Sequence, residues 1–137
     1  MKAFLSSAAL LLSIASANAQ AFPPGAIPVT ASATGTTAAT TATLPAVALQ
    51  TTYICGFAIR VNATAAATGN ATVTGTVTGT MNFTQWTAPA ASGIGLVDHT
   101  FNPCIPGSSI NTGIAVVSAA PGTGGIVSVS AWGYQKQ

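Results

Sequence analysis

The sequence predicts an all-β protein: a small antiparallel β-sandwich, jelly-roll or Greek-key-like, with one disulfide and a cleaved signal peptide before it. Three observations lead to this prediction. Apolar and polar residues alternate with period two in several short segments, as in strands that are buried on one face. Turn-forming residues separate these segments at intervals of roughly 8–12 residues, which is typical of all-β domains. Beyond the N-terminal leader, no segment has the 3.6-residue apolar period of a surface helix.

Residues 1–19 have the three-part organisation of a secretory signal peptide. Lys2 supplies the positive charge, Phe4–Ile14 form an apolar stretch, and Ala17 and Ala19 are the small residues of a cleavage site. The apolar stretch is too short to span a bilayer, which takes about 20 residues. The alternative is a buried N-terminal helix. Cleavage after Ala19 leaves a mature chain from Gln20, in which we expect no membrane span.

Residues 20–49 form a segment rich in proline, alanine and threonine that precedes a β-sandwich domain at residues 50–137. Gln20–Pro28 holds three of the eight prolines, and Thr30–Thr43 contains only Ala, Thr, Ser and Gly. Because this tract has no large apolar side chain to bury, it cannot offset its ordering entropy alone. We expect either a flexible linker or an edge strand that its neighbours stabilise.

The first long strand of the domain is expected at residues 53–61. Its odd positions are all apolar and Arg60 lies on the opposite face, which predicts a half-buried strand. The residues assigned to the core face are Tyr53, Cys55, Phe57, Ile59 and Val61. A turn region is expected to follow at residues 63–70.

A run of alternating threonines comes next. The threonines at positions 72, 74, 76, 78 and 80 occupy one face, and apolar side chains such as Val73 and Phe83 occupy the other. Gly79 is expected to break this run into a hairpin, with strands near 71–77 and 80–87.

The last part of the chain supplies three further strands. A short strand at 96–101 is expected to end at Asn102 and Pro103, since proline cannot donate to a sheet ladder. Segments 110–118 and 126–134 provide the other two strands. In the last one, Val127 and Val129 share one face, and Trp132 and Tyr134 share the opposite face.

The two cysteines, Cys55 and Cys104, predict a disulfide. An even number of cysteines in an exported protein favours pairing over free thiols. The bond would close a loop of about 50 residues and contribute about 4 kcal/mol in the chain-entropy model.

Ionisable side chains are nearly absent. Charged residues make up 3% of the chain, against about 25% in an ordinary soluble domain. Of the 137 residues, 28 are Ala and 21 are Thr. After the leader, only Arg60, Asp98, His99 and Lys136 carry ionisable side chains other than Cys and Tyr. Two cations far apart cannot neutralise several phosphates, which argues against nucleic-acid binding.

The same scarcity argues against catalysis, cofactors and metals. Asp98 and His99 are adjacent, and adjacent residues of a strand point to opposite faces, so within a strand at 96–101 they cannot form an acid–imidazole pair. A bulge or turn at this place is the alternative that would allow the pair. Most glycoside hydrolases use two carboxylates, and this sequence has one carboxylate side chain, Asp98. A zinc site takes three or four ligands, so in this chain it would need the two cysteines that are predicted to form the disulfide. We therefore expect no catalytic residue, no metal and no cofactor.

Three Asn-x-Thr sequons begin at Asn62, Asn70 and Asn82. In a eukaryotic secretory pathway they would accept glycans. In a bacterium they would be chance occurrences in a threonine-rich chain.

The candidates for a binding surface are Trp86, Thr72, Thr74 and Thr76. Trp86 lies beside a loop and is expected to be exposed, whereas Tyr53 and Trp132 are expected to fill the core. The threonines repeat every second residue, about 6.8 Å apart, and such an array could match an ordered surface. Their β-propensity alone also accounts for them.

These observations lead to two functional expectations. The first is a secreted or cell-surface protein, periplasmic in some bacteria, with a structural or interaction role and no enzymatic activity. Its low charge removes the repulsion that keeps domains apart, so self-association or contact with another surface protein or glycan is expected. The alternative is a carbohydrate-binding or adhesive module that uses Trp86 or the threonine face.

Overall fold

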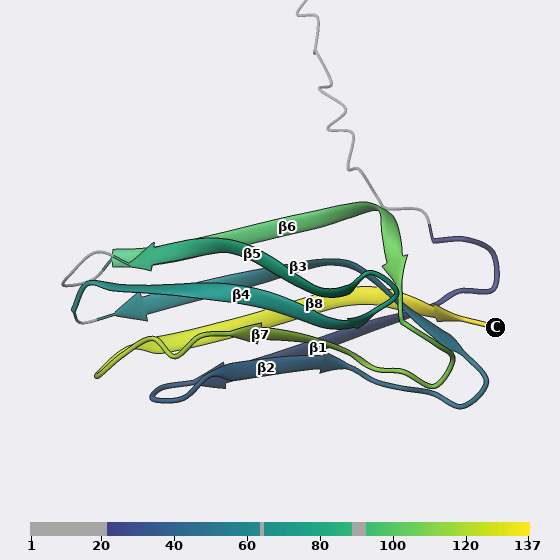
Figure 1. Ribbon diagram of the computed structural model, residues 1–137, viewed down its shortest axis with the longest axis horizontal. Coiled ribbons are helices and arrows are strands. Elements are labelled where there is room, and N and C mark those ends of the chain that lie inside the picture. The colour runs from purple at the N-terminus through teal and green to yellow at the C-terminus, as the bar shows by residue number, and fades with distance from the viewer. Residues whose placement is uncertain (1–21, 64, 89–92) are drawn as a thin grey trace, which may run out of the picture.

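The computed structural model describes residues 22–63, 65–88 and 93–137, and every regular element in these ranges is a β-strand (Figure 1). This part of the chain contains no helix, and so none long and apolar enough to cross a membrane. The prediction of an all-β fold is confirmed. The strands are β1 (Ile27–Gly35), β2 (Thr40–Leu44), β3 (Thr51–Ala63), β4 (Ala67–Thr76), β5 (Gly79–Ala88), β6 (Gly93–Pro106), β7 (Ile114–Ser118) and β8 (Ile126–Lys136).

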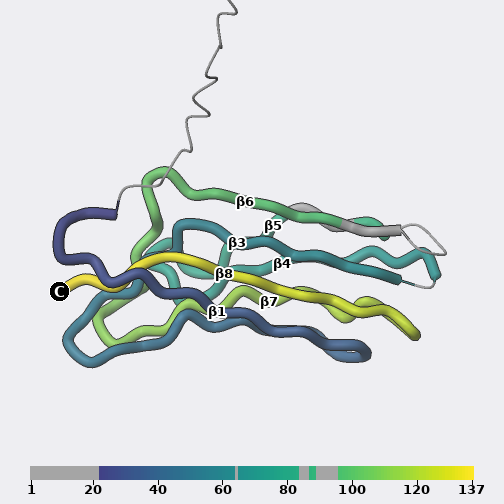
Figure 2. Tube along the Cα trace, turned by 180° about the vertical axis from the view of Figure 1, so that it is seen from behind, coloured from purple at the N-terminus to yellow at the C-terminus, as the bar shows by residue number. Residues whose placement is uncertain are grey.

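The eight strands form two antiparallel sheets of four strands each. Sheet A has the order β1-β8-β3-β6, and sheet B has the order β2-β7-β4-β5. The pairing is nested, because β1 pairs with β8, β2 with β7, β3 with β6 and β4 with β5. As a result, β1 and β2 run along one side of the molecule, and β5 and β6 run along the other (Figure 1, Figure 2).

Buried side chains from both sheets belong to one hydrophobic cluster. Sheet A contributes Phe57, Ile59 and Val61 from β3, and sheet B contributes residues such as Leu44 and Val73. Strands β2 and β7 show the clean period-two burial that one-sided packing requires. Phe57 of β3 and Phe83 of β5 meet edge to face, with ring centroids 4.9 Å apart.

A β-bulge at Cys55 divides β3 into two halves whose side chains alternate out of phase. The register with both neighbouring strands shifts between Ile54 and Gly56. After the bulge Phe57 faces the core, whereas before it Ile54 is fully buried and Tyr53 is half-buried. The expectation that Tyr53 shares the core face with Phe57 is wrong, because an extra residue in a strand reverses the alternation.

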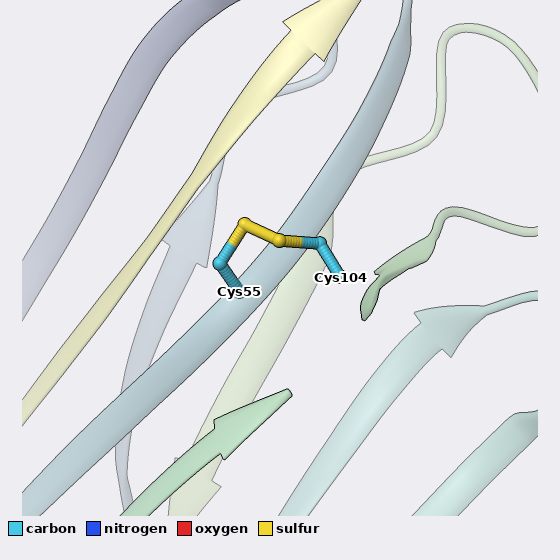
Figure 3. The surroundings of a disulfide bond; sticks show 2 residues. All are labelled: Cys55 and Cys104. Atoms are coloured by element: carbon cyan, nitrogen blue, oxygen red, sulfur yellow. A yellow bond between two sulfur atoms is a disulfide. The ribbon is translucent and has the colours of Figure 1, made fainter. Parts of the chain in front are cut away.

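The disulfide lies at this bulge. The sulfur atoms of Cys55 and Cys104 are 1.98 Å apart, at bonding distance, and the Cα atoms are 4.3 Å apart (Figure 3). The predicted pairing is confirmed. Cys104 lies inside a strand, however, since β6 continues through the cis Asn102–Pro103 peptide to Pro106. The predicted strand end at residue 101 is wrong. Residues 101–104 form a bulge opposite Cys55, so Pro103 lies at a position where the β3–β6 ladder has no regular residue pair to lose.

The hairpin predicted around Gly79 joins β4 to β5, with Thr76 opposite Gly79. The connection before β4 is shorter than predicted, since β4 begins at Ala67. Gly75 has φ +84° and sits where the β4–β5 register shifts, so the alternation of the threonines is broken there. Thr76 is only 2% exposed, and its Oγ1 donates to the carbonyl of Gly79 at 2.7 Å. The expectation that Thr76 shares an exposed face with Thr72 and Thr74 is wrong.

Segment 20–49 contains two of the edge strands. β1 is the edge of sheet A and pairs with β8 through nine consecutive residue pairs, while β2 is the edge of sheet B and pairs with β7. Residues 30–43 therefore belong mostly to strands and not to a linker. The predicted signal peptide, residues 1–19, lies outside the described residues.

Candidate functional site

The side chains of sheet A that point away from the core form a grid across its four strands. In register, the grid has four rows: Thr34–Ser128–Arg60–Leu96, Ser32–Ser130–Ala58–Asp98, Thr30–Trp132–Gly56–Thr100 and Pro28–Tyr134–Tyr53–Pro106. The first two rows consist of small and charged residues together with Leu96, and the last two hold the large aromatic rings. Sequence alternation placed Trp132 and Tyr134 on one face of their strand, and the register brings Tyr53 to the same face.

Trp132 lies across Gly56 of the neighbouring strand. A Cβ added to Gly56 would be 2.6 Å from Cε2 of the indole, so only glycine allows the ring to occupy this place. The neighbour of Trp132 on β1 is the small residue Thr30. The indole is half-buried, and the expectation that Trp132 fills the core is wrong, because its strand alternation turns it to the opposite face from Val129.

Two tyrosines and a phenylalanine continue the aromatic surface. Tyr53 and Tyr134 stack with ring centroids 4.6 Å apart and an interplanar angle of 13°, and Phe22 meets Tyr134 edge to face at 5.5 Å. Burial raises the pKa of the Tyr134 phenol, and the charge of Tyr53 adds to the increase. We refer to Phe22, Tyr53, Trp132 and Tyr134 as the aromatic patch.

A tight turn places Phe22 against the sheet. The amide of Ala26 donates to the carbonyl of Pro23 at 3.0 Å, and Gly25 has φ +78°. Pro24 and Gly25 thus occupy the two central positions of a type II turn, which favours proline first and a left-handed glycine second. The turn reverses the chain just before β1 and leaves Phe22 beside Tyr134.

A hollow of about 300 Å³ adjoins the aromatic patch. It lies where β1 and β3 begin and β8 ends, at the end of the molecule marked C in Figure 1. Lys136, which lines the hollow, is two residues beyond Tyr134 of the patch on β8, and two residues span about 7 Å along a strand. The residues that line the hollow are Gly25, Ile27, Gln50, Gln135, Lys136 and Gln137.

Glutamine amides dominate the polar lining of this hollow. Gln135 is 4% exposed, and its Nε2 donates to the carbonyl of Pro45 at 2.7 Å. Gln50 differs, because its Oε1 is buried and accepts no hydrogen bond from any group in the described part of the chain. A buried acceptor without a donor is unfavourable by about 1–3 kcal/mol. Gln50 is a lining residue of the hollow, and its Oε1 itself has almost no exposed surface.

Charge is distributed unequally between the sheets. Sheet A carries Arg60, Asp98 and Lys136 on the same face as the aromatic patch, and His99 in its edge strand β6. The four strands of sheet B contain no residue with an ionisable side chain. Within the described ranges, no three His, Cys, Asp or Glu residues gather as metal ligands would.

Asp98 and His99 occupy neighbouring positions in β6. Asp98 pairs with Ala58 and His99 with Phe57, so their side chains leave opposite faces of the strand. The imidazole of His99 packs against aromatic rings, with centroids 4.8 Å from both Phe83 and Phe101. His99 thus caps an aromatic cluster at the β5–β6 side of the molecule.

The residues predicted for binding lie on the other sheet. Thr72 and Thr74 point away from the core, in register with Val117 and Ala115 of β7, and these pair in turn with Thr41 and Thr43 of β2. The structure thus adds two β2 threonines that the sequence alone did not connect to Thr72 and Thr74. Trp86 belongs to β5 opposite Gly69. Its side chain lies outside the described part, so its predicted exposure stays a prediction.

Sequence reasoning did not identify the aromatic patch, because it assigned Tyr53 and Trp132 to the core. Two signals pointed to it: the alternation of Trp132 and Tyr134 opposite Val127 and Val129, and the glycine directly after Cys55. Comparisons of the chain with protein families, with curated proteins and with solved structures find no match.

Proposed function

We propose that the chain is an exported structural protein without catalytic activity, which associates with further copies of itself through the open edge of sheet A. The observation that carries this proposal is β1. Within the described part of the chain its backbone pairs with β8 alone, and it has no charged residue and no bulge over nine residues. An uncharged, regular edge of this length offers unpaired amide and carbonyl groups to another strand.

The fold proposed for this function is a jelly-roll sandwich. Its support is the nested pairing of β1 with β8, β2 with β7, β3 with β6 and β4 with β5, which is the pattern of one long antiparallel hairpin rolled into two sheets. The shared hydrophobic cluster of the two sheets supports the same arrangement. In such a fold only the edge strands have unpaired backbone groups.

Export is part of the proposal. The disulfide of Cys55 with Cys104 is compatible with an extracellular location, because such bonds persist in oxidising compartments. Cleavage after Ala19 would make Gln20 the first residue of the mature chain, two residues before Phe22. We propose that the protein works at the cell surface or in an extracellular assembly.

The test compares two lysine substitutions in the secreted chain. Ser32 of β1 and Ser130 of β8 are both exposed, and they face each other in register. Ser32→Lys places a charge on the open edge, and Ser130→Lys places the same charge on a strand whose backbone is paired on both sides. Sedimentation velocity over a range of concentrations measures the association.

We expect the wild type to associate, Ser32→Lys to remain monomeric, and Ser130→Lys to associate like the wild type. A monomeric wild type at the highest soluble concentration would overturn the proposal. Equal weakening by both substitutions would overturn it too, since net charge and not the edge would then control association.

A further inference from the structure

We propose that the aromatic patch and the adjoining hollow bind a neutral oligosaccharide, with one pyranose ring on Trp132 and the hydroxyl groups of another sugar unit in the hollow. This site uses side chains on the outer face of sheet A, including Thr30 of β1, whereas the proposed self-association uses the backbone of the β1 edge. It also lies on the opposite sheet from the threonines that sequence reasoning selected.

The first argument is the position of the indole. Trp132 lies over Gly56 on the side of sheet A that is turned away from the core, and its β1 neighbour is only a threonine. The face of an aromatic ring carries partial negative charge, and the C–H groups of a pyranose ring carry partial positive charge. A sugar ring can therefore pack on the indole, while hydroxyls at its rim reach Thr30 and Thr100 in the same row.

The second argument is the rigidity of the aromatic patch. Tyr53 and Tyr134 hold each other by stacking, and Phe22 is held against Tyr134 by the turn at Pro24 and Gly25. Rings that are fixed before binding lose little conformational entropy when a ligand arrives. Tyrosine phenols are protonated at neutral pH, and burial raises the pKa of Tyr134 further, so this phenol can donate to a sugar oxygen.

The third argument is that the hollow has a polar lining that suits hydroxyl groups. Gln50 is one of its residues, and its buried Oε1 accepts no hydrogen bond from any described group. The hollow is about 300 Å³, a size that holds a monosaccharide unit, and its other polar side chains are Gln135, Lys136 and Gln137. A sugar hydroxyl can accept from Lys136, and a small rotation of the Gln50 amide would bring its oxygen to another hydroxyl. The hollow thus offers the mixed donors and acceptors that hydroxyl groups require.

The fourth argument is charge complementarity. Among the residues of the aromatic patch and the hollow, Lys136 is the single one with a charged side chain. Arg60 and Asp98 lie farther along the same face, and their opposite charges sum to zero. A neutral polyhydroxylated ligand needs no counter-charge, whereas a polyanion would find only Lys136 and a polycation would find no carboxylate side chain among these residues.

The test is calorimetric titration of the secreted chain with soluble oligosaccharides of glucose, mannose, galactose and N-acetylglucosamine. We expect at least one of these neutral glycans to bind and to shift the tryptophan fluorescence. Trp132→Ala should weaken this binding about tenfold or more, because it removes the stacking surface. Trp132→Phe should retain part of the affinity, and it keeps the test valid if the alanine variant does not fold.

Two further variants separate the site from the rest of the face. Gln50→Leu removes the acceptor at nearly constant volume and should weaken binding several-fold, by the worth of one hydrogen bond. Leu96→Ala is the matched control, since Leu96 is 56% exposed on the same face but lies in the row farthest from the tyrosine row. It should leave the affinity unchanged.

The outcomes are distinct from those of the assembly experiment. Absence of binding to every glycan of the panel overturns the carbohydrate site, and so does a folded Trp132→Ala variant with wild-type affinity. A loss of affinity in Leu96→Ala equal to that in Trp132→Ala also overturns it. The monomeric Ser32→Lys variant should still bind the glycan, so failure of one proposal leaves the other standing.

Discussion

β1 and β6 are both edge strands of sheet A, yet they present different surfaces to a neighbouring molecule. β6 contains Asp98, His99 and two prolines, and it leaves the ladder at residues 101–104, where Cys104 bonds to Cys55. β1 has one proline near its start, at Pro28, and then runs in unbroken register to Gly35. The bend of β6 near its end is visible in Figure 1.

The comparison shows how a chain with few charges can protect one edge and leave the other open. Charged side chains, prolines and bulges are the devices by which edge strands avoid pairing with other molecules, and β6 combines all three. β1 lacks the charge and the bulge. Three predictions test whether this difference is energetic as well as geometric.

Removal of the disulfide should have the largest effect, because it releases the irregular segment of the protected edge. Reduction with dithiothreitol should lower the free energy of unfolding by about 4 kcal/mol, the loop entropy of a bond across 49 residues. Urea denaturation with and without reductant measures the change. The Cys55→Ala/Cys104→Ala double variant is the control, and reductant should not destabilise it further. A loss below about 1 kcal/mol would show that packing alone holds the bulged segments.

The second prediction compares packing on the two sides of the molecule. Phe83→Ala removes a ring that contacts Phe57, His99 and Phe101 on the β5–β6 side. We expect a loss of about 2–3 kcal/mol, below the range for a fully buried ring because Phe83 is half-buried. Val29→Ala, in β1, should cost about 1 kcal/mol. Equal losses, measured by chemical denaturation, would mean that the open edge is packed as firmly as the protected one.

The third prediction concerns alkaline pH and the start of β1, where Pro28 lies opposite Tyr134. The pKa of Tyr134 is raised in the folded state, so the folded state favours the protonated phenol. The associated stability is therefore present below the unfolded pKa of about 10 and is lost as pH rises through the folded value. Denaturation midpoints from neutral to alkaline pH should fall less steeply for Tyr134→Phe than for the wild type. Parallel curves for the two proteins would contradict this assignment.

Much of the fold could be predicted from the sequence, because strand alternation is a local property. The strand of Phe57, the hairpin at Gly79 and the last strand follow from period-two patterns, and the cysteine pair follows from their number. The errors at Tyr53, Thr76 and the end of β6 arise where a bulge interrupts the regular ladder, and a pattern of period two cannot show where that happens. The error at Trp132 is different, because the regular alternation of β8 already put this residue opposite Val127 and Val129.

The candidate site was less predictable, since it joins residues from distant parts of the chain. Trp132 and Tyr134 were recognised as one face of a strand, but their neighbours Gly56 and Tyr53 depend on the register of β8 with β3. The unsatisfied Oε1 of Gln50 has no counterpart in any sequence motif. The threonines Thr72 and Thr74 were found, but their partners Thr41 and Thr43 required the order of sheet B.

The all-β class, the cysteine pair and the scarcity of charge follow from the amino-acid sequence alone. Composition can be counted directly, and strand alternation involves only positions that are close in the chain. Tertiary structure decided which strands became edges, which face carries the aromatic rings, and that a proline-containing segment stays within a strand. These features depend on register between strands far apart in the chain, and a shift of one residue moves every side chain to the other face.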